Sequence, residues 1–156
     1  FMELKNINIG FALTGSFCTF EKTIKILKEI KKQGANILPI MSFNAYNLDT
    51  KFGTAKEHIN EIEDITGNKI IHTIQAAEPI GPKKMTDIMV IAPASSNTIS
   101  KLANGINDTP VTMATKSHLR NNKPVLIAIS TNDALGANAE NIRKIIKHKK
   151  LLFCAI

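Results

Sequence analysis

Residues 7–41 read INIGFALTGSFCTFEKTIKILKEIKKQGANILPIM, and this stretch decides the fold. Residues 7–13 are a short, largely apolar run that ends in a Thr-Gly-Ser turn, which is typical of a buried strand. Between residues 20 and 33, apolar side chains recur at helical spacing. A second apolar run follows at residues 37–41. The order strand, turn, helix, strand predicts a βαβ unit and therefore a parallel sheet.

The rest of the chain continues this alternation. Residues 87–92 are the clearest strand because their apolar positions are continuous, as in a sheet that is covered on both faces, and Pro93 is expected to end it. The polar residues 42–54 are predicted to form a loop, and residues 78–84 a connection with Pro and Gly. The predicted fold is α/β, a Rossmann-like open parallel sheet with helices on both faces. We expect further helices at 55–65, 95–103, 110–119 and 138–148, and further strands at 69–72, 125–129 and 151–155.

The chain has 156 residues, which is the size of one domain. We expect a single domain over residues 2–156, with Met2 as the natural start and Phe1 as a cloning remnant. Because the sequence stops directly after a strand, we expect equally that this strand ends the domain or that a C-terminal tail is missing. No apolar run approaches the about 20 residues of a membrane span, and no secretory signal is recognisable. We therefore expect a cytoplasmic protein that does not bind membranes.

A net charge of +7 is compatible with nucleic-acid binding. The basic residues gather at 22–32, on the outer face of one predicted helix, and at 143–150, where cations suit a helix C-terminus. Aromatic residues are scarce and do not interleave with them. We therefore expect no nucleic-acid partner, and interpret the charge as an attraction for anionic ligands. Two cysteines are too few for a disulfide framework or a zinc site, so we expect no metal, and we expect Cys154 in the core.

Small and hydroxyl-bearing residues follow four of the predicted strands. In open parallel sheets, ligands bind beyond the carboxyl ends of the strands. Glycine lets backbone amides approach an anion, hydroxyl groups can donate hydrogen bonds, and the following helices point their N-termini at the same place. Each loop alone is compatible with an ordinary turn, but four loops on one sheet edge predict a site. The candidate cofactor-binding residues are Thr14, Gly15, Ser16, Ser42, Asn44, Pro93, Ala94, Ser95, Ser96, Asn97, Thr98, Ser130, Thr131 and Asn132.

No Lys or Arg lies within these loops, so backbone and hydroxyl donors would have to hold a phosphate. The Gly-x-Gly-x-x-Gly fingerprint is absent after the first strand, and a Walker-type Gly-Lys-Ser is absent too. The sequence thus disfavours a dinucleotide site of the usual kind and a P-loop. It predicts a different phosphate-bearing cofactor.

A longer pattern starts at the third of these loops. The run Pro93-Ala94-Ser95-Ser96-Asn97-Thr98, followed by Lys101, Ala103-Asn104-Gly105 and Asp108, resembles the signature of the FMN-binding cysteine decarboxylase superfamily. That superfamily includes phosphopantothenoylcysteine decarboxylase and the flavin prenyltransferases. The resemblance implies a flavoprotein three-layer sandwich, FMN near subunit contacts, and a homo-oligomer that is either a trimer or a dodecamer.

Within the superfamily, the chain is similar over nearly its whole length to the family of dipicolinate synthase B subunits. That resemblance implies an oxidoreductase subunit. Paired with a dehydrogenase-like A subunit that uses NAD(P), it would oxidise dihydrodipicolinate to dipicolinate during sporulation. The alternatives are a stand-alone FMN-dependent decarboxylase or flavin prenyltransferase-like enzyme, and a non-catalytic assembly subunit. The similar segments are 10–16 with Cys18, 42–44 with 50–53, 78–83, 119–124 and 129–136.

The sequence leaves the catalytic residue open, with Cys18, Lys101 and Asp108 as candidates. Cys18 could be a reactive thiolate at a helix start, or it could pack between Phe17 and Phe20, which is the favoured interpretation. Lys101 could bind a flavin or substrate carboxylate or lie in solvent, and Asp108 could accept a proton or serve a turn. The decarboxylases resembled here use a histidine near the flavin, whereas none of the four histidines lies in a predicted site loop. Decarboxylation by that route is therefore disfavoured.

Overall fold

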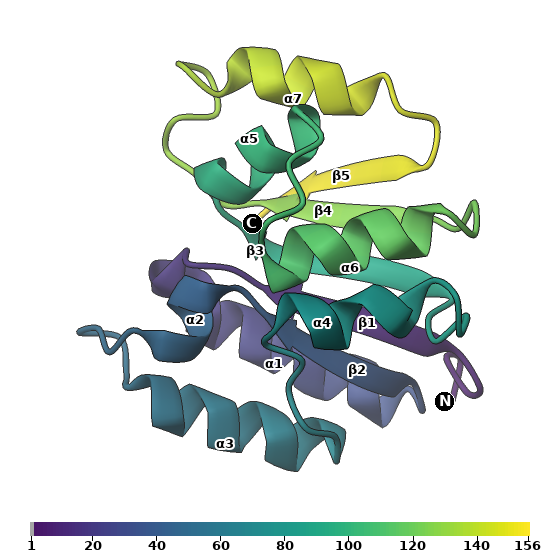
Figure 1. Cartoon of the computed structure of the whole chain (residues 1–156). Coiled ribbons are helices and arrows are strands. Elements are labelled where there is room, and N and C mark those ends of the chain that lie inside the picture. The colour runs from purple at the N-terminus through teal and green to yellow at the C-terminus, as the bar shows by residue number, and fades with distance from the viewer. Residues whose placement is uncertain (1) are drawn as a thin grey trace.

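The computed structural model describes residues 2–156, so Phe1 and the prediction made for it lie outside the described residues. One five-stranded sheet with the strand order β2-β1-β3-β4-β5 forms the centre of the molecule (Figure 1). Every neighbouring pair of strands is parallel. This confirms the predicted Rossmann-like parallel sheet. The strands are β1 (Asn8–Leu13), β2 (Asn36–Met41), β3 (Ile88–Ala94), β4 (Val125–Ile129) and β5 (Leu151–Ala155).

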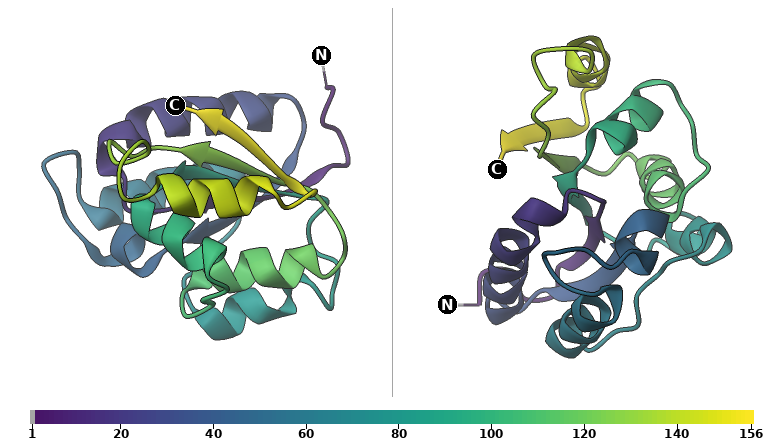
Figure 2. Two further views of the ribbon diagram at one scale, coloured as in Figure 1. Left: turned by 90° about the horizontal axis from the view of Figure 1, so that it is seen from above. Right: turned by 90° about the vertical axis from the view of Figure 1, so that its left-hand side faces the viewer.

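Helices cover both faces of this sheet, as Figure 2 shows in views from above and from the side. The helices α1 and α3 lie on one face, and α4, α5, α6 and α7 lie on the other. The short helix α2 follows β2 at the carboxyl edge. Their bounds are α1 (Phe20–Lys32), α2 (Phe43–Asn47), α3 (Ala55–Thr66), α4 (Ile74–Ala77), α5 (Ser96–Ala103), α6 (Pro110–Leu119) and α7 (Ala139–Ile146), with 3-10 turns η1 (Phe17–Thr19) and η2 (Glu78–Ile80).

Two apolar cores result because successive strand residues point to opposite faces of the sheet. Phe11 of β1 packs with Phe20 and Leu27 of α1 in the first core. Met89 of β3 packs with Val111 of α6 in the second core. The continuous apolar runs in the sequence reflect this burial on both faces.

Two of the helix boundaries are fixed by local features that can be read from the sequence. Thr54 caps α3 by accepting a bond from the Glu57 amide, and the Glu57 carboxylate accepts one from the Thr54 amide at 2.8 Å. This reciprocal pair is a capping box, which satisfies amides that the first helical turn leaves free. Gly67 ends the same helix with a φ of 71°.

The strand β3 differs from its prediction, because it continues through Pro93 to Ala94. Its register against β4 shifts between Ile91 and Ala94. Such an irregularity accommodates a proline, which has no amide hydrogen to donate to a neighbouring strand. The prediction that Pro93 ends the strand is therefore wrong, although its physical basis holds.

Three other local predictions were incomplete. The polar residues 42–54 contain the helix α2, which Ser42 caps by accepting a bond from the Ala45 amide. The expected strand at 69–72 is reduced to one bridge between Ile40 and Ile71. Short helical turns, α4 and η2, precede and enter the expected connection at 78–84. Patterns of four or five residues carry too little periodicity to reveal such elements.

Cys154 is exposed, so its predicted place in the core is wrong. It lies on β5, the edge strand, where Leu151 and Phe153 pack on the side of α7. Leu152, which alternates with them, is 54% exposed. Residues 151–154 therefore have one covered and one uncovered side, a distinction that their sequence does not make.

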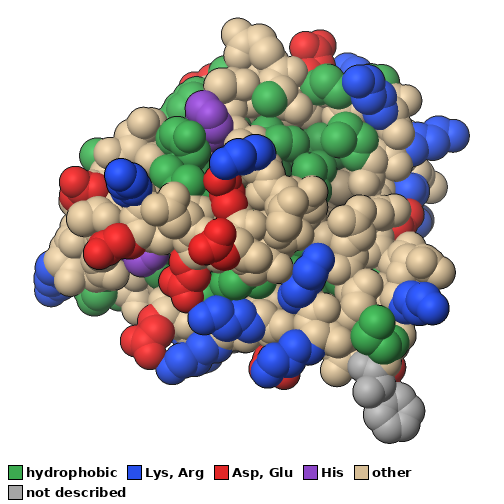
Figure 3. All heavy atoms as spheres, turned by 90° about the horizontal axis from the view of Figure 1, so that it is seen from below, with side chains coloured by type: hydrophobic (Ala, Val, Ile, Leu, Met, Phe, Trp, Pro, Cys, Tyr) green, Lys and Arg blue, Asp and Glu red, His purple; other side chains and the backbone are tan. Residues whose placement is uncertain are grey.

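Many of the charged side chains are interspersed rather than segregated. Figure 3 shows Lys, Arg, Asp and Glu side chains mixed over the side of the molecule that is seen from below. On α1, Lys25 is paired with Glu21 at 2.7 Å, and Lys28 is paired with Glu61 of α3 at 2.8 Å. Among the described residues, no helix is long and apolar enough to cross a membrane.

Candidate functional site

The strand order creates a crevice at the carboxyl edge of the sheet. The strands β1 and β3 are neighbours, but β1 leads into α1 on one face and β3 leads into α5 on the other. The two loops therefore diverge, and in sheets of this order such a switch point is where ligands bind. Gly15, after β1, and Ser95, after β3, each border two cavities at this place.

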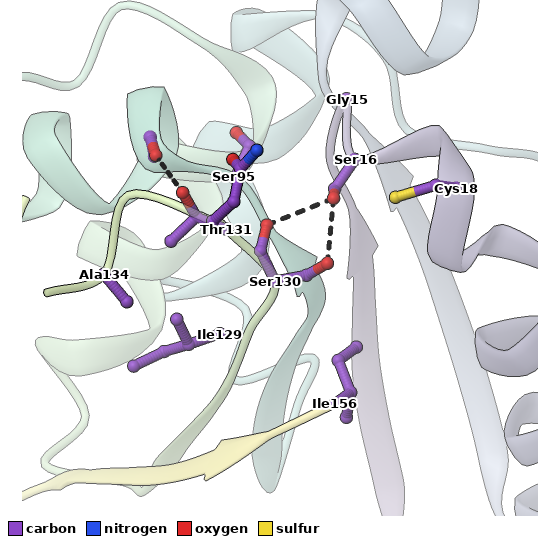
Figure 4. A pocket seen from close by; sticks show the side chains of 11 residues that line it. Gly15, Ser16, Cys18, Ser95, Ile129, Ser130, Thr131, Ala134 and Ile156 are labelled. Carbon is purple, nitrogen blue, oxygen red and sulfur yellow. Dashed lines mark hydrogen bonds between the residues drawn. The ribbon is translucent and has the colours of Figure 1, made fainter.

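The first cavity has a volume of about 560 Å³ and lies between the loops that follow β1, β3 and β4 (Figure 4). Apolar side chains of Ile129, Ala134 and Ile156 form part of its wall. Seven of the predicted cofactor-binding residues line it, which brings together segments more than a hundred residues apart in the chain. They are Gly15, Ser16, Ser95, Ser96, Ser130, Thr131 and Asn132.

The second cavity, of about 330 Å³, lies between the loops that follow β1, β2 and β3. It is lined by Lys101 from α5 and by Thr109, the N-cap residue of α6. Sequence reasoning missed Thr109 and Phe43, although Thr109 could have been found because a Thr-Pro pair marks a helix start. The predicted residues that line this cavity are Gly15, Ser42, Asn44, Ser95, Asn97 and Thr98.

Three predicted residues do not line either cavity. Thr14, Pro93 and Ala94 are buried beneath the loops. The Thr14 hydroxyl donates to the Pro93 carbonyl at 2.6 Å and accepts from the Ser95 amide at 2.9 Å. These residues therefore join the loop after β1 to the loop after β3.

A cluster of hydroxyl groups closes one wall of the first cavity (Figure 4). Ser16 Oγ lies 2.8 Å from Ser130 Oγ and 3.1 Å from the Ser130 carbonyl oxygen, to which it can donate. Thr19 Oγ1 donates to the Ser16 carbonyl at 2.9 Å and lies 3.2 Å from Ser130 Oγ. Each of these hydroxyl protons has an acceptor within the cluster, so the wall offers oxygen lone pairs to the cavity. A similar bond joins Ser96 to Thr131.

The charge in the second cavity comes from one ion pair. Lys101 Nζ lies 2.7 Å from Asp108 Oδ1, and the Lys101 side chain is 22% exposed. The hydrogen bond from Lys101 lowers the pKa of the Asp108 carboxyl group, which is therefore ionised at neutral pH. Of the described residues that line the two cavities, Lys101 is the only Lys or Arg, and none is a histidine. Lys101 is thus neither free in solvent nor free of a partner.

Cys18 lines the first cavity and is exposed, so the favoured interpretation that it is packed between two phenylalanines is wrong. The rings of Phe17 and Phe20 contact each other directly, with their centroids 5.1 Å apart. The turn η1 places Cys18 outside this pair. Figure 4 shows its sulfur on the side of Ser16.

Comparisons with known proteins agree with this architecture. The family model described as Flavoprotein matches residues 2–153. The chain belongs to the flavoprotein family. This flavoprotein-family chain is 47% identical to the B subunit of dipicolinate synthase from Bacillus subtilis over 151 residues, which are 97% of the chain and 76% of that protein. It therefore groups with the dipicolinate synthase B subunits, as the sequence motifs predicted.

Solved structures are similar to this flavoprotein-family chain as well. The crystal structure of the dipicolinate synthase B subunit from Bacillus halodurans has a TM-score of 0.87 and 43% identity, and the match covers 97% of this chain and 78% of that one. The structure of Burkholderia xenovorans DmrB in complex with FMN has a TM-score of 0.74 and 19% identity, covering 97% and 89%. The second match shows a shared fold.

Proposed function

We propose that this chain is the B subunit of a dipicolinate synthase and holds FMN at the carboxyl edge of its sheet. With a dehydrogenase-like A subunit, it serves the NAD(P)-linked oxidation of dihydrodipicolinate to dipicolinate during sporulation. The identity of 47% to a protein of that name supports the activity. The observation that supports FMN binding is that Gly15, after β1, and Ser95, after β3, each border both cavities. In sheets of this general kind, FMN is one of the ligands that bind at such a switch point.

The two cavities differ in charge and polarity, as do the phosphate and the ring of FMN. The second cavity offers cationic and neutral donors, with Lys101, Ser42 and Asn97 at its wall and the N-terminus of α5 beside them. These groups suit a phosphate. The first cavity offers the lone pairs of Ser16 and Ser130 beside apolar side chains. This wall suits a flat, neutral ring that carries an N–H group.

In this proposal, the role of the chain's own residues is to bind and orient the cofactor. Asp108 holds Lys101 in place, and the hydroxyl cluster of Ser16 and Ser130 fixes the distance between two loops. Bound FMN would supply the capacity to accept or donate a hydride. Because the described residues around the first cavity include Cys18 as their only titratable side chain, we assign proton transfer and nicotinamide binding to the partner protein.

The same proposal covers the organisation of the protein. Residues 2–156 act as one flavoprotein-like domain in the cytoplasm, and copies of it assemble as a trimer or a dodecamer around flavin sites near subunit contacts. The parallel sheet with one layer of helices on each face supports a single domain. Light scattering on the purified protein tests the assembly.

The decisive experiment measures FMN uptake and dipicolinate formation together. We expect the purified chain to show flavin absorption bands with FMN, and the A subunit to form dipicolinate faster when the chain is present. The variant Lys101→Gln should weaken FMN binding about tenfold, since it removes a charge-assisted hydrogen bond to phosphate. The exposed Lys22 provides the control variant Lys22→Gln, which should bind as the wild type does. A chain that takes up no FMN and leaves the rate of the A subunit unchanged contradicts the proposal.

A second candidate is an assembly protein that has kept the fold without the cofactor. The hydroxyl cluster favours it, because Ser16, Thr19 and Ser130 satisfy one another without a ligand. A chain that binds the A subunit and raises its rate while taking up no FMN would select this function. Decarboxylation by the isolated chain is disfavoured, because among residues 2–156 no histidine lines either cavity.

A further inference from the structure

A third cavity, of about 460 Å³, lies next to the candidate site, between the last turn of α5, residues 104–109 and α6. We call it the α5–α6 groove. Neighbouring residues of α5 line the two cavities, since Lys101 lines the second cavity and Leu102 lines the groove. The two therefore share the last turn of α5.

The α5–α6 groove combines apolar side chains with two cations. Leu102 and Leu119, which are half-buried, form its apolar part. Lys116 lies in the last turn of α6 and Arg120 is its C-cap residue, and helical residues four apart are about 6 Å from each other along the axis. No acidic side chain lines the groove within the part of the chain that the structure describes.

The two cations are the charged donors that the groove offers to a ligand. The hydroxyl of Thr115 donates to the Val111 carbonyl at 2.8 Å, and the side-chain amide of Asn107 donates one of its two N–H groups to the Gly105 carbonyl at 2.8 Å. Neither Lys116 nor Arg120 has an ion-pair partner among the described residues. A cation that has no protein partner and borders an apolar wall favours an anionic ligand with an apolar body.

We propose that the α5–α6 groove is a second ligand site, which binds a small aromatic carboxylate. The apolar part suits a flat ring, and two cations one helical turn apart suit one or two carboxylate groups. Sugars and free phosphate fit less well, because they need more polar partners than this wall offers. The residues that line the groove lie outside both other cavities, so its test does not require bound FMN. The choice of a pyridine dicarboxylate as one probe rests on the proposed function, because that compound is dipicolinate.

The segment 104–109 connects the groove to the candidate site. Asn107 lines the groove, Asp108 holds Lys101, and Thr109 lines the second cavity. A ligand that displaces Asn107 therefore displaces its neighbour Asp108, and with it the cation of the second cavity. Occupation of the groove is expected to change the affinity of the second cavity for anions.

Calorimetric titration of the full chain with pyridine-2,6-dicarboxylate and with benzoate tests the site. We expect both probes to bind, the dicarboxylate more tightly. The variants Lys116→Gln and Arg120→Gln should each weaken its binding about tenfold, which corresponds to about 1.4 kcal/mol. The control Lys22→Gln removes an exposed lysine of α1 and should leave the affinity unchanged. Amide NMR signals of residues 105–109 should shift on titration of the wild type and not of the double variant.

Several outcomes would overturn the proposal. One is the absence of binding of either probe at millimolar concentration, and another is an unchanged affinity in the double variant. A loss of binding in Lys101→Gln with full binding in the double variant would place the probe in the second cavity. If the double variant alters the assembly by light scattering and not the titration, the groove is a contact between copies. Thermal unfolding of each variant checks that the fold is intact, and FMN uptake is measured separately.

Discussion

His118 is a buried side chain, and both of its ring nitrogens are hydrogen-bonded. Its Nε2 lies 2.8 Å from the Pro124 carbonyl, to which it donates, so its Nδ1 accepts from the Thr86 hydroxyl at 2.7 Å. Burial lowers the pKa of His118. In the unfolded chain, where the pKa of a histidine is about 6.5, this side chain therefore binds a proton more readily than in the folded chain. This residue's stabilising contribution is complete above that pH and is lost as the pH falls below it.

We expect the free energy of unfolding to fall as the pH drops through about 6.5, the pKa of an unfolded histidine, and the fall to be smaller in His118→Gln. Urea unfolding at several pH values measures this slope. The control is His148→Gln, since His148 is exposed and its replacement should leave the slope as in the wild type. An identical slope in wild type and His118→Gln would show that His118 is not the group responsible.

Gly81 is packed so closely that a larger side chain does not fit at this position. A Cβ atom built there would overlap the Ser117 backbone carbonyl, and the Gly81 amide donates to the Ser117 hydroxyl at 2.7 Å. We expect Gly81→Ala to lower the free energy of unfolding by about 3 kcal/mol through overpacking. Lys83→Ala, two residues away and exposed, should change it by less than about 0.5 kcal/mol. Equal stability of the two variants in urea unfolding would contradict this account.

Among the elements, α3 depends on its N-terminal capping box. Thr54→Ala removes both the acceptor for the Glu57 amide and a donor to the Glu57 carboxylate. We expect a loss of about 1 kcal/mol in the free energy of unfolding. Lys56→Ala, in the first turn of the same helix but outside the box, is the control and should be close to neutral. If both variants unfold at the same urea concentration, the box does not stabilise the helix in this protein.

The same helix explains why the regular elements could be predicted. Its start, its period and its stop at Gly67 are all local signals, and the same holds for α1, α6 and the central strands. The helix α2 could not be predicted because five residues show too little periodicity, and the passage of β3 through Pro93 could not be predicted because it depends on tertiary contacts. Thr14, for example, bonds to the Pro93 carbonyl across 79 residues of sequence.

At the scale of the whole molecule, the predicted sheet topology was sufficient to locate the candidate site. It was not sufficient to predict which side chains contact each other there. That the loops after four strands meet at one edge follows from parallel strands alone. That Ser16 and Ser130 bond to each other, and that Lys101 reaches the second cavity from α5, depends on side-chain directions that no periodic pattern encodes. Asp108 was a candidate catalyst in sequence, and in the structure it holds Lys101.

Gly15 borders both cavities, so one substitution there tests the whole site. Its nearest neighbour for a new Cβ would be Asn44 Cβ at 3.4 Å, which is an ordinary contact. We expect Gly15→Leu to fold with a free energy of unfolding within about 1 kcal/mol of the wild type and to lose FMN uptake. Gly67→Ala should lower the free energy of unfolding, because Gly67 has a left-handed φ of 71° at the end of α3. It should leave FMN uptake unchanged, because Gly67 lies outside both cavities. Flavin fluorescence quenching and urea unfolding measure the two effects; normal uptake by Gly15→Leu would contradict the location of the site.

The bridge made by the Thr14 hydroxyl has a consequence for how a ligand enters. This one oxygen is hydrogen-bonded to both the Pro93 carbonyl and the Ser95 amide. The turns after β1 and β3 are therefore held in one position relative to each other. The spacing of these two turns is set during folding, so a ligand loses little affinity to reorganisation on this side of the site. We expect this spacing to be the same with and without a bound ligand.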